Sequence, residues 1–486
     1  MRFRFIPLLS CVALAMLVIG CGGGSGGNGG GPAPGPTPNP PPNPPPSPPP
    51  GGPPSAGITA VNHVVIMIQE NRSFDHYFGQ MTAYRAANGI PINASPATIE
   101  DESAGSFSNF SIATGASIAA YHTGSVCTED LTPDWTETHK NFDWENPAGA
   151  NSSSPMDGFA SLAVQISQYA ATLGIHMADQ DGRRVMGYFD GNDLNYYYFM
   201  ASNFAMGDRF YSPIPSNTPA QRHFLFAATS QGYVHDGPGP GKLTAKTIWQ
   251  NLDATGVSWK IYSEETNLFT YLEDFAYFNQ PGVSAKVVSV NQFFTDAAAG
   301  QLPAVSFIET GLHDGLSEHT SNFDPANPQQ GEVPINVQVG AQFASKVINS
   351  VMEGPSWTDS VIFFAHDEGG GFFDHVPPIS VPSPDGIKPV DLTSTDVPGD
   401  FTMSASRVPN MVISPFAKKN FVSHTPMDYT AYLHFIETRW SLPTLTARDA
   451  AMPDMTEFLD FTGKPWATPP SPPQQKMTGV CDFTKQ

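Results

Sequence analysis

Two pairs of oxygen-bearing side chains stand directly after apolar runs of the sequence. Glu70 and Asn71 follow the run HVVIMIQ, and Asp367 and Glu368 follow the run SVIFFAH. Three carboxylates held close together repel one another unless a cation or protons intervene. Oxygen ligands suit a hard ion such as Ca²⁺, Mg²⁺ or Mn²⁺, whereas Zn²⁺ or Fe would be favoured if histidines joined them. These residue types therefore predict one divalent metal ion, provided that the fold brings the two pairs together.

The same residues also have a purely structural interpretation. Glu70 could cap a following helix, and Asp367-Glu368 could begin a turn into Gly369–Gly371. Three glycines after a strand permit a close approach of the backbone to a ligand, but they equally permit a tight turn. His375, a few residues later, is more often a structural histidine than a ligand. On residue type and position alone, both interpretations stay open.

The elements that must position these residues are readable from the hydrophobic pattern. Short apolar runs that end in polar or Gly-rich stretches are typical of parallel strands, and they occur at residues 63–69, 304–308, 360–365 and 408–413. Apolar residues recur every four positions from Val339 to Val351, which predicts an amphipathic helix ending before Gly354-Pro355. Residues 428–440 predict another. We therefore expect an α/β sheet with helices on both faces, and a ligand crevice beyond the carboxyl ends of its strands.

The first 56 residues differ from the rest of the chain. Arg2 and Arg4 precede an apolar run that is short for a membrane span, so residues 1–20 predict an export signal. The end of this segment, LVIGC, resembles the bacterial lipobox, in which Cys21 would carry lipid; an ordinary signal peptide cleaved near the glycines is the alternative. Residues 21–56 are a Gly/Pro-rich linker that cannot bury apolar surface. Residues 57–486 have the composition of a globular domain.

The net charge and the cysteines of the chain make some functions and binding partners less favourable than others. The formal net charge of −22 disfavours nucleic acid and anionic membranes as partners, although a metal ion could still make a phosphate substrate acceptable. Beyond Cys11 and Cys21, the cysteines are Cys127 and Cys481. In an oxidising compartment these two could form a disulfide or remain free thiols, and so distant a pair makes a poor zinc site.

Four separated segments resemble, in the same order, the bacterial phosphoesterase family that holds phosphatidylcholine-hydrolysing phospholipases C and related acid phosphatases. They are HVVIMIQENRSFDHYFG, PSNTPAQRHFLFAATSQG, HDEGGGFFDHVPP and RVPNMVISPFAKKNFVSHTPMDYTAYLHFIETRWSLPTLTARDA, and the resemblance runs from about residue 60 to about residue 460. It implies an alkaline-phosphatase-like core, with a mostly parallel sheet sandwiched by helices. It also implies phosphoryl transfer through a covalent hydroxyl nucleophile.

The resemblance assigns roles to particular residues. The implied metal ligands are Glu70, Asn71, Thr218, Asp367 and Glu368, with Thr218 also the nucleophile and His139 and His319 the active-site histidines. A free alcohol is a poor nucleophile near neutral pH, so a hydroxyl in this role needs a metal or a base. Arg222 could hold phosphate or merely make salt bridges.

The chain departs from the family pattern at two places. Ala220-Gln221 replaces the usual Pro-Asn, which leaves Ser216 as an alternative nucleophile. His366 stands where an aromatic residue is frequent, so it could add a ligand or only fill space.

The expectation is an exported phosphoesterase, lipid-anchored to the bacterial cell envelope, with phospholipase C activity on a phospholipid phosphodiester through a phosphothreonine. Two alternatives are an acid-phosphatase-type phosphomonoesterase and a surface lipoprotein that binds a partner without catalysis. Head-group preference, metal identity and oligomeric state are not predicted by the sequence.

Overall fold

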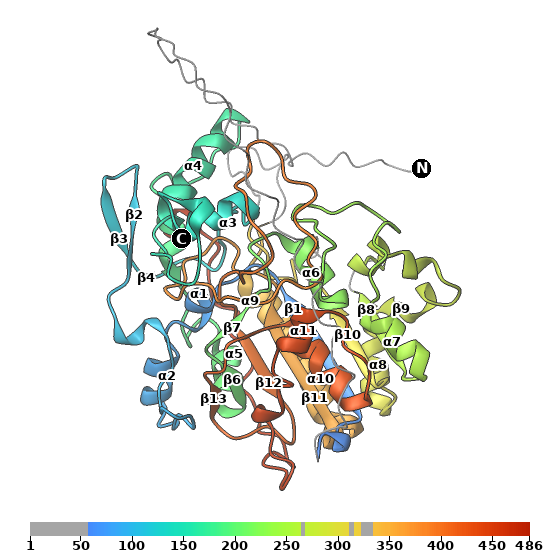
Figure 1. Ribbon diagram of the computed structural model, residues 1–486. Helices are drawn as coiled ribbons and strands as arrows, with labels where there is room; N and C mark the ends of the chain where they lie inside the picture. Colours follow the sequence, from blue (N-terminus) through green and yellow to red (C-terminus); the bar gives the residue numbers. More distant parts are fainter. Residues whose placement is uncertain (1–56, 264–267, 311–314, 322–333) are drawn as a thin grey trace, which may run out of the picture.

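The computed structural model describes residues 57–263, 268–310, 315–321 and 334–486. The predicted signal peptide (1–20), the Gly/Pro-rich linker (21–56) and Cys21 lie outside the described residues. Figure 1 shows a central sheet with helices on both sides. In spatial order its strands are β13 (Phe421–Ser423), β6 (Ala205–Gly207), β12 (Asn410–Ile413), β11 (Ser360–His366), β1 (His63–Gln69), β10 (Val305–Glu309), β8 (Trp259–Ser263) and β9 (Val287–Ser289).

The sheet is parallel except at β12. β1 lies between β10 and β11 and is parallel to both, and β8 and β9 continue the parallel order beyond β10. β12 runs antiparallel to both β11 and β6. The α/β class with a mostly parallel sheet is therefore confirmed. The expectation that residues 408–413 form a parallel strand is wrong, because the chain enters this strand from the opposite end of the sheet.

Helices cover both faces because most strands are apolar on both sides. Alternate side chains of β1 enter two separate hydrophobic cores, with Val64, Ile66 and Ile68 in one and Val65 and Met67 in the other. The first face carries α6 (Thr218–Ala227), α7 (Ile248–Thr255), α10 (Thr430–Trp440) and α11 (Ala447–Ala451). The second carries α1 (Phe74–Phe78), α2 (Met81–Ala87), α5 (Asn195–Asn203), α8 (Val290–Ala299) and α9 (Val337–Glu353). The two helices predicted around residues 339–351 and 428–440 are α9 and α10.

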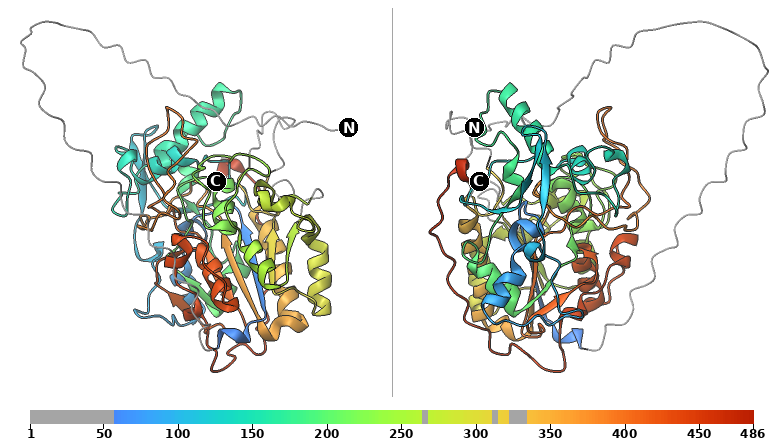
Figure 2. Two further views of the ribbon diagram at one scale, coloured as in Figure 1. Left: turned by 45° about the vertical axis from the view of Figure 1, so that its right-hand side comes forward. Right: turned by 90° about the vertical axis from the view of Figure 1, so that its left-hand side faces the viewer.

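A smaller layer stands near the carboxyl ends of the parallel strands, at the upper end of the molecule in Figures 1 and 2. It consists of α3 (Trp135–Phe142), α4 (Phe159–Thr172), and the short strands β2 (Ser108–Ser111), β3 (Ala116–Ala119), β4 (Tyr121–His122) and β5 (Gly187–Tyr188). β7 (Phe210–Tyr211) pairs with β14 (Met427–Asp428) nearby. Phe142, Phe159, Phe372 and Phe373 share a third hydrophobic core, which fixes this layer to the loop after β11.

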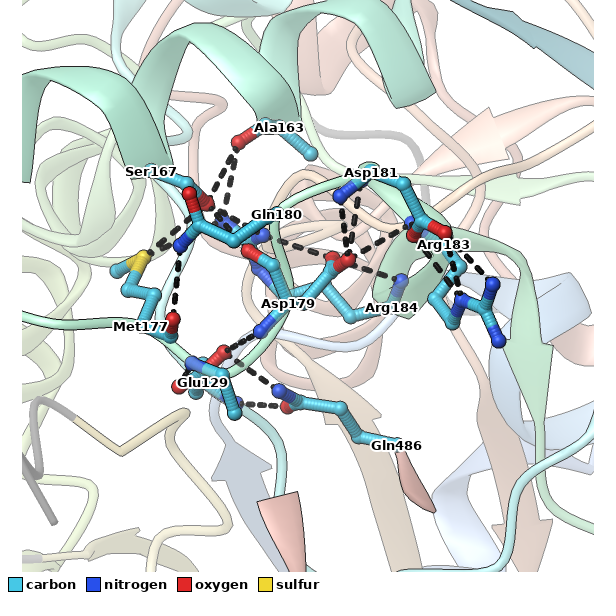
Figure 3. A network of polar contacts seen from close by, with 12 residues as sticks. Glu129, Ala163, Ser167, Met177, Asp179, Gln180, Asp181, Arg183, Arg184 and Gln486 are labelled. Atoms are coloured by element: carbon cyan, nitrogen blue, oxygen red, sulfur yellow. Dashed lines mark hydrogen bonds and ion pairs between the residues drawn. The ribbon is translucent and has the colours of Figure 1, made fainter. Parts of the chain in front are cut away.

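The end of the described chain is tied back to this layer. Cys127 and Cys481 form a disulfide. Next to it, the Glu129 backbone N–H donates to Gln486 Oε1 at 2.6 Å, and the Gln486 amide donates to the Glu129 carboxylate (Figure 3). That carboxylate also accepts from the backbone N–H of Asp179. Among the described residues, no helix is both long and apolar enough to span a membrane.

Candidate active site

Carboxylates from three strand ends converge on one arginine. Gln69 and His366 are register partners at the ends of β1 and β11, so Glu70 and Asp367 leave the sheet side by side. Arg222, from α6, places Nη2 3.1 Å from Glu70 Oε1 and Nη1 3.0 Å from Glu309 Oε1. Its Nε lies 3.4 Å from Asp367 Oδ2. The two acidic pairs predicted from the sequence therefore meet at the edge of the sheet, and Glu309 joins them.

Burial changes the pKa values of the carboxyl groups around Arg222. Removal from water, followed by the nearby Asp367 charge, raises the pKa of Glu70 to about 8. The pKa of Glu368 is raised well above its usual range, first by burial and then by Asp367 and Glu70. Burial disfavours the charged form of Arg222, but the carboxylates around it outweigh burial and raise its pKa. Without a further cation, Glu70 and Glu368 therefore hold protons more tightly than free carboxyl groups do.

Two hydroxyls were candidates for the nucleophile, and they lie differently. Thr218 is the first residue of α6, and its hydroxyl donates to Glu368 Oε1 at 3.2 Å. Ser216 is buried and its hydroxyl donates to the carbonyl of Val234. Gln221 fixes the preceding loop by donating to the carbonyls of Ile214 and Ser216. Thr218 is therefore the hydroxyl that faces the carboxylates, at a helix N-terminus that favours an anion.

Buried oxygens without hydrogen-bond partners show whether a metal would fit. Within the described part of the chain, these include Glu70 Oε2, Asn71 Oδ1, Asp367 Oδ2 and Glu368 Oε2. Such orphan acceptors are rare in folded proteins, and oxygen ligands of this kind are those a hard divalent cation prefers. The residues present therefore fit a divalent ion.

Tighter carboxylate–histidine groups occur elsewhere in the described residues. Asp75, Asp374 and His375 form one, and its carboxylates already pair with Arg407 at 2.9 and 3.0 Å. His122, Asp190 and Asp193 form another, which is partly exposed. Glu70, Asp367 and Glu368 do not form so compact a group, because Arg222 lies among them.

The glycine run after Glu368 serves close packing. At Gly370 φ is +62°, and a Cβ there would lie 2.3 Å from the carbonyl oxygen of Asn71. Asn71 itself has φ +59°, and its backbone N–H donates to Asp367 Oδ1 at 3.3 Å. Only glycine lets the loops after β1 and β11 approach this closely.

His319 lies beside the carboxylate group. The Glu70 backbone N–H donates to the Ser317 carbonyl at 2.7 Å, which places the 317–319 loop against β1. The Thr320 carbonyl is 2.7 Å from His319 Nδ1 and can only accept, so Nδ1 carries a hydrogen. Burial lowers the pKa of His319, but the Asp130 and Glu70 carboxylates overcome this and raise it above its usual value.

Between His319 and the strand ends, Glu318 organises the loop. The Glu318 carboxylate accepts from Gln69, Tyr77 and Tyr197 and lies 3.2 Å from His366 Nε2. His366 is thus a partner of Glu318, which explains why a polar ring stands at this buried position.

Two other predicted residues make contacts of their own. His139 has Nδ1 2.6 Å from the carbonyl of Trp135, its ring packs on Trp135, and burial lowers its pKa to about 4. Its neighbours Thr138 and Asn141, rather than His139, line a small pocket beside Glu368 and the glycine run. Among the contacts described for His139 there is none to these carboxylates, and its active-site role stays a prediction. The guanidinium of Arg222 forms salt bridges with Glu70, Glu309 and Asp367, and Arg222 is not among the residues that line the pocket.

Sequence reasoning missed Glu309 and Asp134. Glu309 ends β10 just as Glu70 follows β1, so the same strand-end argument could have found it. Asp134 accepts from Asn217, the residue before Thr218, at 2.9 Å, and burial raises its pKa to about 6. Nothing in the pattern around Asp134 pointed to the site.

Comparison with known sequences shows which protein family the chain belongs to. The sequence model of the phosphoesterase family matches residues 61–443, so the chain belongs to the phosphoesterase family. A non-hemolytic phospholipase C of Burkholderia pseudomallei is 27% identical over 479 residues, with 85% of this chain and 61% of that protein covered. Phospholipase C B of Mycobacterium tuberculosis is 28% identical over 459 residues, with 85% and 80% covered. The chain thus spans less than two thirds of the first relative and four fifths of the second. Family and relatives support a hydrolase acting on phosphoric ester bonds.

Solved structures show similarity at much lower identity. A protein in the alkaline phosphatase superfamily from Vibrio parahaemolyticus is 11% identical, with 54% of this chain and 66% of that chain covered and a TM-score of 0.31. Murine ectonucleotide pyrophosphatase/phosphodiesterase 5 is 10% identical, with 55% and 95% covered and a TM-score of 0.34.

Proposed function

We propose that this protein is a phospholipase C-type phosphoesterase that hydrolyses the phosphodiester of a phospholipid through a phosphothreonine at Thr218. The observation that carries the proposal is the position of the Thr218 hydroxyl, at the N-terminus of α6 and 3.2 Å from Glu368 Oε1. Glu70, Asn71 and Asp367 lie at the adjacent strand ends. The phospholipase C relatives support a lipid phosphodiester as the substrate.

The side chains have separate tasks in this reaction. Glu70, Asn71, Asp367, Glu368 and Thr218 would hold a divalent ion, which lowers the pKa of a bound hydroxyl and neutralises phosphoryl oxygens. Thr218 Oγ1 attacks phosphorus, and the bond to the diacylglycerol oxygen breaks. The carboxylates beside His319 raise its pKa, and its Nδ1 bonds to the Thr320 carbonyl, so we assign to Nε2 the donation of a proton to the departing alcohol. Water then hydrolyses the phosphothreonine.

The metal's identity is left open by the donor set. Oxygen donors favour Ca²⁺, Mg²⁺ or Mn²⁺, and Zn²⁺ or Fe would require a histidine in the set.

The Thr218 hydroxyl is tested by substitution. Thr218→Ala should abolish phosphocholine release from phosphatidylcholine, whereas Thr218→Ser should retain measurable turnover because it keeps a hydroxyl. Ser216→Ala is the matched control, since that hydroxyl is bonded to Val234, and it should keep most activity. Acid quenching with labelled substrate should trap label on Thr218. Full activity of Thr218→Ala would refute the assignment.

Turnover of two chromogenic substrates distinguishes the proposed phospholipase C activity from the alternative functions. Faster turnover of p-nitrophenyl phosphate than of p-nitrophenyl phosphorylcholine would favour an acid-phosphatase-type monoesterase instead. Turnover of neither would favour a surface lipoprotein that binds without catalysis, although the intact set of Glu70, Asn71, Thr218, Asp367 and Glu368 speaks against a decayed site.

We further propose that the protein is exported and lipid-anchored to the bacterial cell envelope, in the periplasm or on the surface. The composition of residues 1–56 supports this, with a signal-like segment, a lipobox-like ending and a linker that holds the enzyme away from its anchor. Mass spectrometry of the mature N-terminus would show a diacylated Cys21; an unmodified N-terminus within the glycines would refute the anchor.

A further inference from the structure

Three large apolar side chains protrude from the layer that stands above the strand ends. Phe110 and Ile112, in and after β2, are 46% and 41% exposed, and Leu173, at the end of α4, is 49% exposed. We call these three residues the apolar rim.

The segments that carry the apolar rim also lack charge. Residues 103–128 contain no Asp, Glu, Lys or Arg, and neither do residues 158–178, although 14% of the chain is charged and its net charge is −22. Exposed protein surface normally keeps charged groups in water, so two uncharged segments under exposed apolar side chains are unusual in so acidic a chain. An uncharged surface of this kind suits a partner that would make charges costly to desolvate.

The apolar rim is close to the candidate active site. The α4 helix and the β2–β3 hairpin stand at the same end of the molecule as α3 and α6, in both Figure 1 and Figure 2. Phe159 of α4 contacts Phe373 with ring centroids 5.4 Å apart, and Phe373 follows the glycine run that lines the pocket. A surface that seats the apolar rim therefore also brings the pocket near that surface.

The rim residues are held on a rigid support. Ser161 of α4 donates to the Phe110 carbonyl at 2.7 Å, which fixes the hairpin to the helix. Figure 3 shows Arg184 beneath α4, where it donates to Ser167 Oγ and to the Ala163 carbonyl and pairs with Asp179 at 2.9 Å. The support keeps the apolar side chains presented at little entropic cost on docking.

We propose that the apolar rim docks this enzyme onto a zwitterionic phospholipid bilayer, so that a lipid head group is brought close to Glu368 and the Thr218 hydroxyl that bonds to it. The inference rests on the proposed function, which supplies the lipid substrate. The chain's negative charge disfavours anionic lipid. Phe110 is bonded to Ser161 near the start of α4, and Leu173 lies at the other end of this helix of 14 residues, which is roughly 20 Å long. A deformable interface can seat side chains that are so far apart.

The test measures binding to vesicles separately from catalysis. All proteins begin at residue 22, so that neither the apolar export signal nor lipid on Cys21 can mask the effect. The test uses two rim variants, the triple variant Phe110→Ser/Ile112→Ser/Leu173→Ser and the single variant Leu173→Ser. The matched control is Met477→Ser, because the Met477 side chain is 42% exposed but lies on the segment that runs past α5 and α9. Co-sedimentation with phosphatidylcholine vesicles reports docking. The rate on phosphatidylcholine vesicles divided by the rate on p-nitrophenyl phosphorylcholine reports its use in catalysis.

The triple variant should lose at least about tenfold in vesicle partitioning and in the rate ratio. Both quantities should fall less in Leu173→Ser, and in Met477→Ser they should equal those of the parent. If the parent hydrolyses no phosphoester but still partitions in a rim-dependent way, the docking stands and the proposed function falls. Unchanged partitioning of the triple variant would overturn the docking, as would equal loss in Met477→Ser or tighter parent binding to phosphatidylglycerol vesicles. A parent dimer that the triple variant dissociates, seen by sedimentation velocity, would overturn it in favour of a second copy.

Discussion

Arg222 neutralises carboxylates from three neighbouring strands, β1, β10 and β11. All four groups are buried, and the loss of a buried cation leaves its partners uncompensated at about 3–5 kcal/mol. Arg222→Met should therefore lower the unfolding free energy of the chelated protein by about that amount in urea titration, and a divalent ion should restore part of it. Arg209→Met is the control, because its pair with Glu100 is exposed and is worth about 0–1 kcal/mol. Equal stability of the two variants would contradict the role given to Arg222.

Glu102 offers a pH test away from the candidate metal ligands. Burial first, and then the charges of Asp75 and Asp374, raise its pKa to about 9. A raised carboxyl pKa means that the folded state binds the proton more tightly than the unfolded state, so the stability from this proton is present at low pH and is lost as pH rises from about 4.5 to about 9. Glu102→Gln mimics the protonated form.

The melting temperature of Glu102→Gln should equal that of the parent near pH 5 and exceed it by a few degrees near pH 8.5. Glu145→Gln, at an exposed position, should show no such trend. A Glu102→Gln advantage that shrinks as pH rises would show that the sign is wrong.

At the scale of the elements, the loops after β1 and β11 depend on glycine at position 370. Gly370→Ala adds strain at φ +62° and drives a Cβ into the Asn71 carbonyl, so it should weaken metal affinity by roughly tenfold or more in calorimetric titration. Gly386→Ala is a matched control, with φ +73° and open space around its Cβ, and it should bind metal as the parent does. Similar affinity in both variants would mean that the contact between the loops does not position the ligands.

The strand-end argument explains what the sequence could and could not predict about these elements. It placed Glu70 and Asp367 correctly, because parallel strands in register end together, and Glu309 was within its reach. It failed for residues 408–413, since an apolar run carries no information on strand direction. The role of His139 stays a prediction: its helix neighbours Thr138 and Asn141 line the pocket, and a sequence does not show which way each residue of a helix faces.

At the scale of the whole molecule, the layer above the strand ends connects the candidate metal site with the proposed docking surface. A disulfide joins Cys127 to Cys481, near the end of the described chain. The next residue, Thr128, accepts a hydrogen bond at 2.8 Å from Arg72, which is two residues after Glu70. The sequence left this disulfide open against two free thiols, and it gave no sign of the contact between Arg72 and Thr128, although the fold class and the two acidic pairs were predicted.

The central claim is that acidic residues of β1 and β11 hold one divalent ion that the Thr218 hydroxyl needs in order to react. The most direct test is elemental analysis of the purified protein, with phosphoester turnover measured before and after chelation. The account predicts about one divalent ion per chain and loss of turnover on chelation, with the ion absent from Asp367→Asn and retained in Glu102→Gln. Full turnover by metal-free protein, or an undiminished metal content in Asp367→Asn, would contradict it.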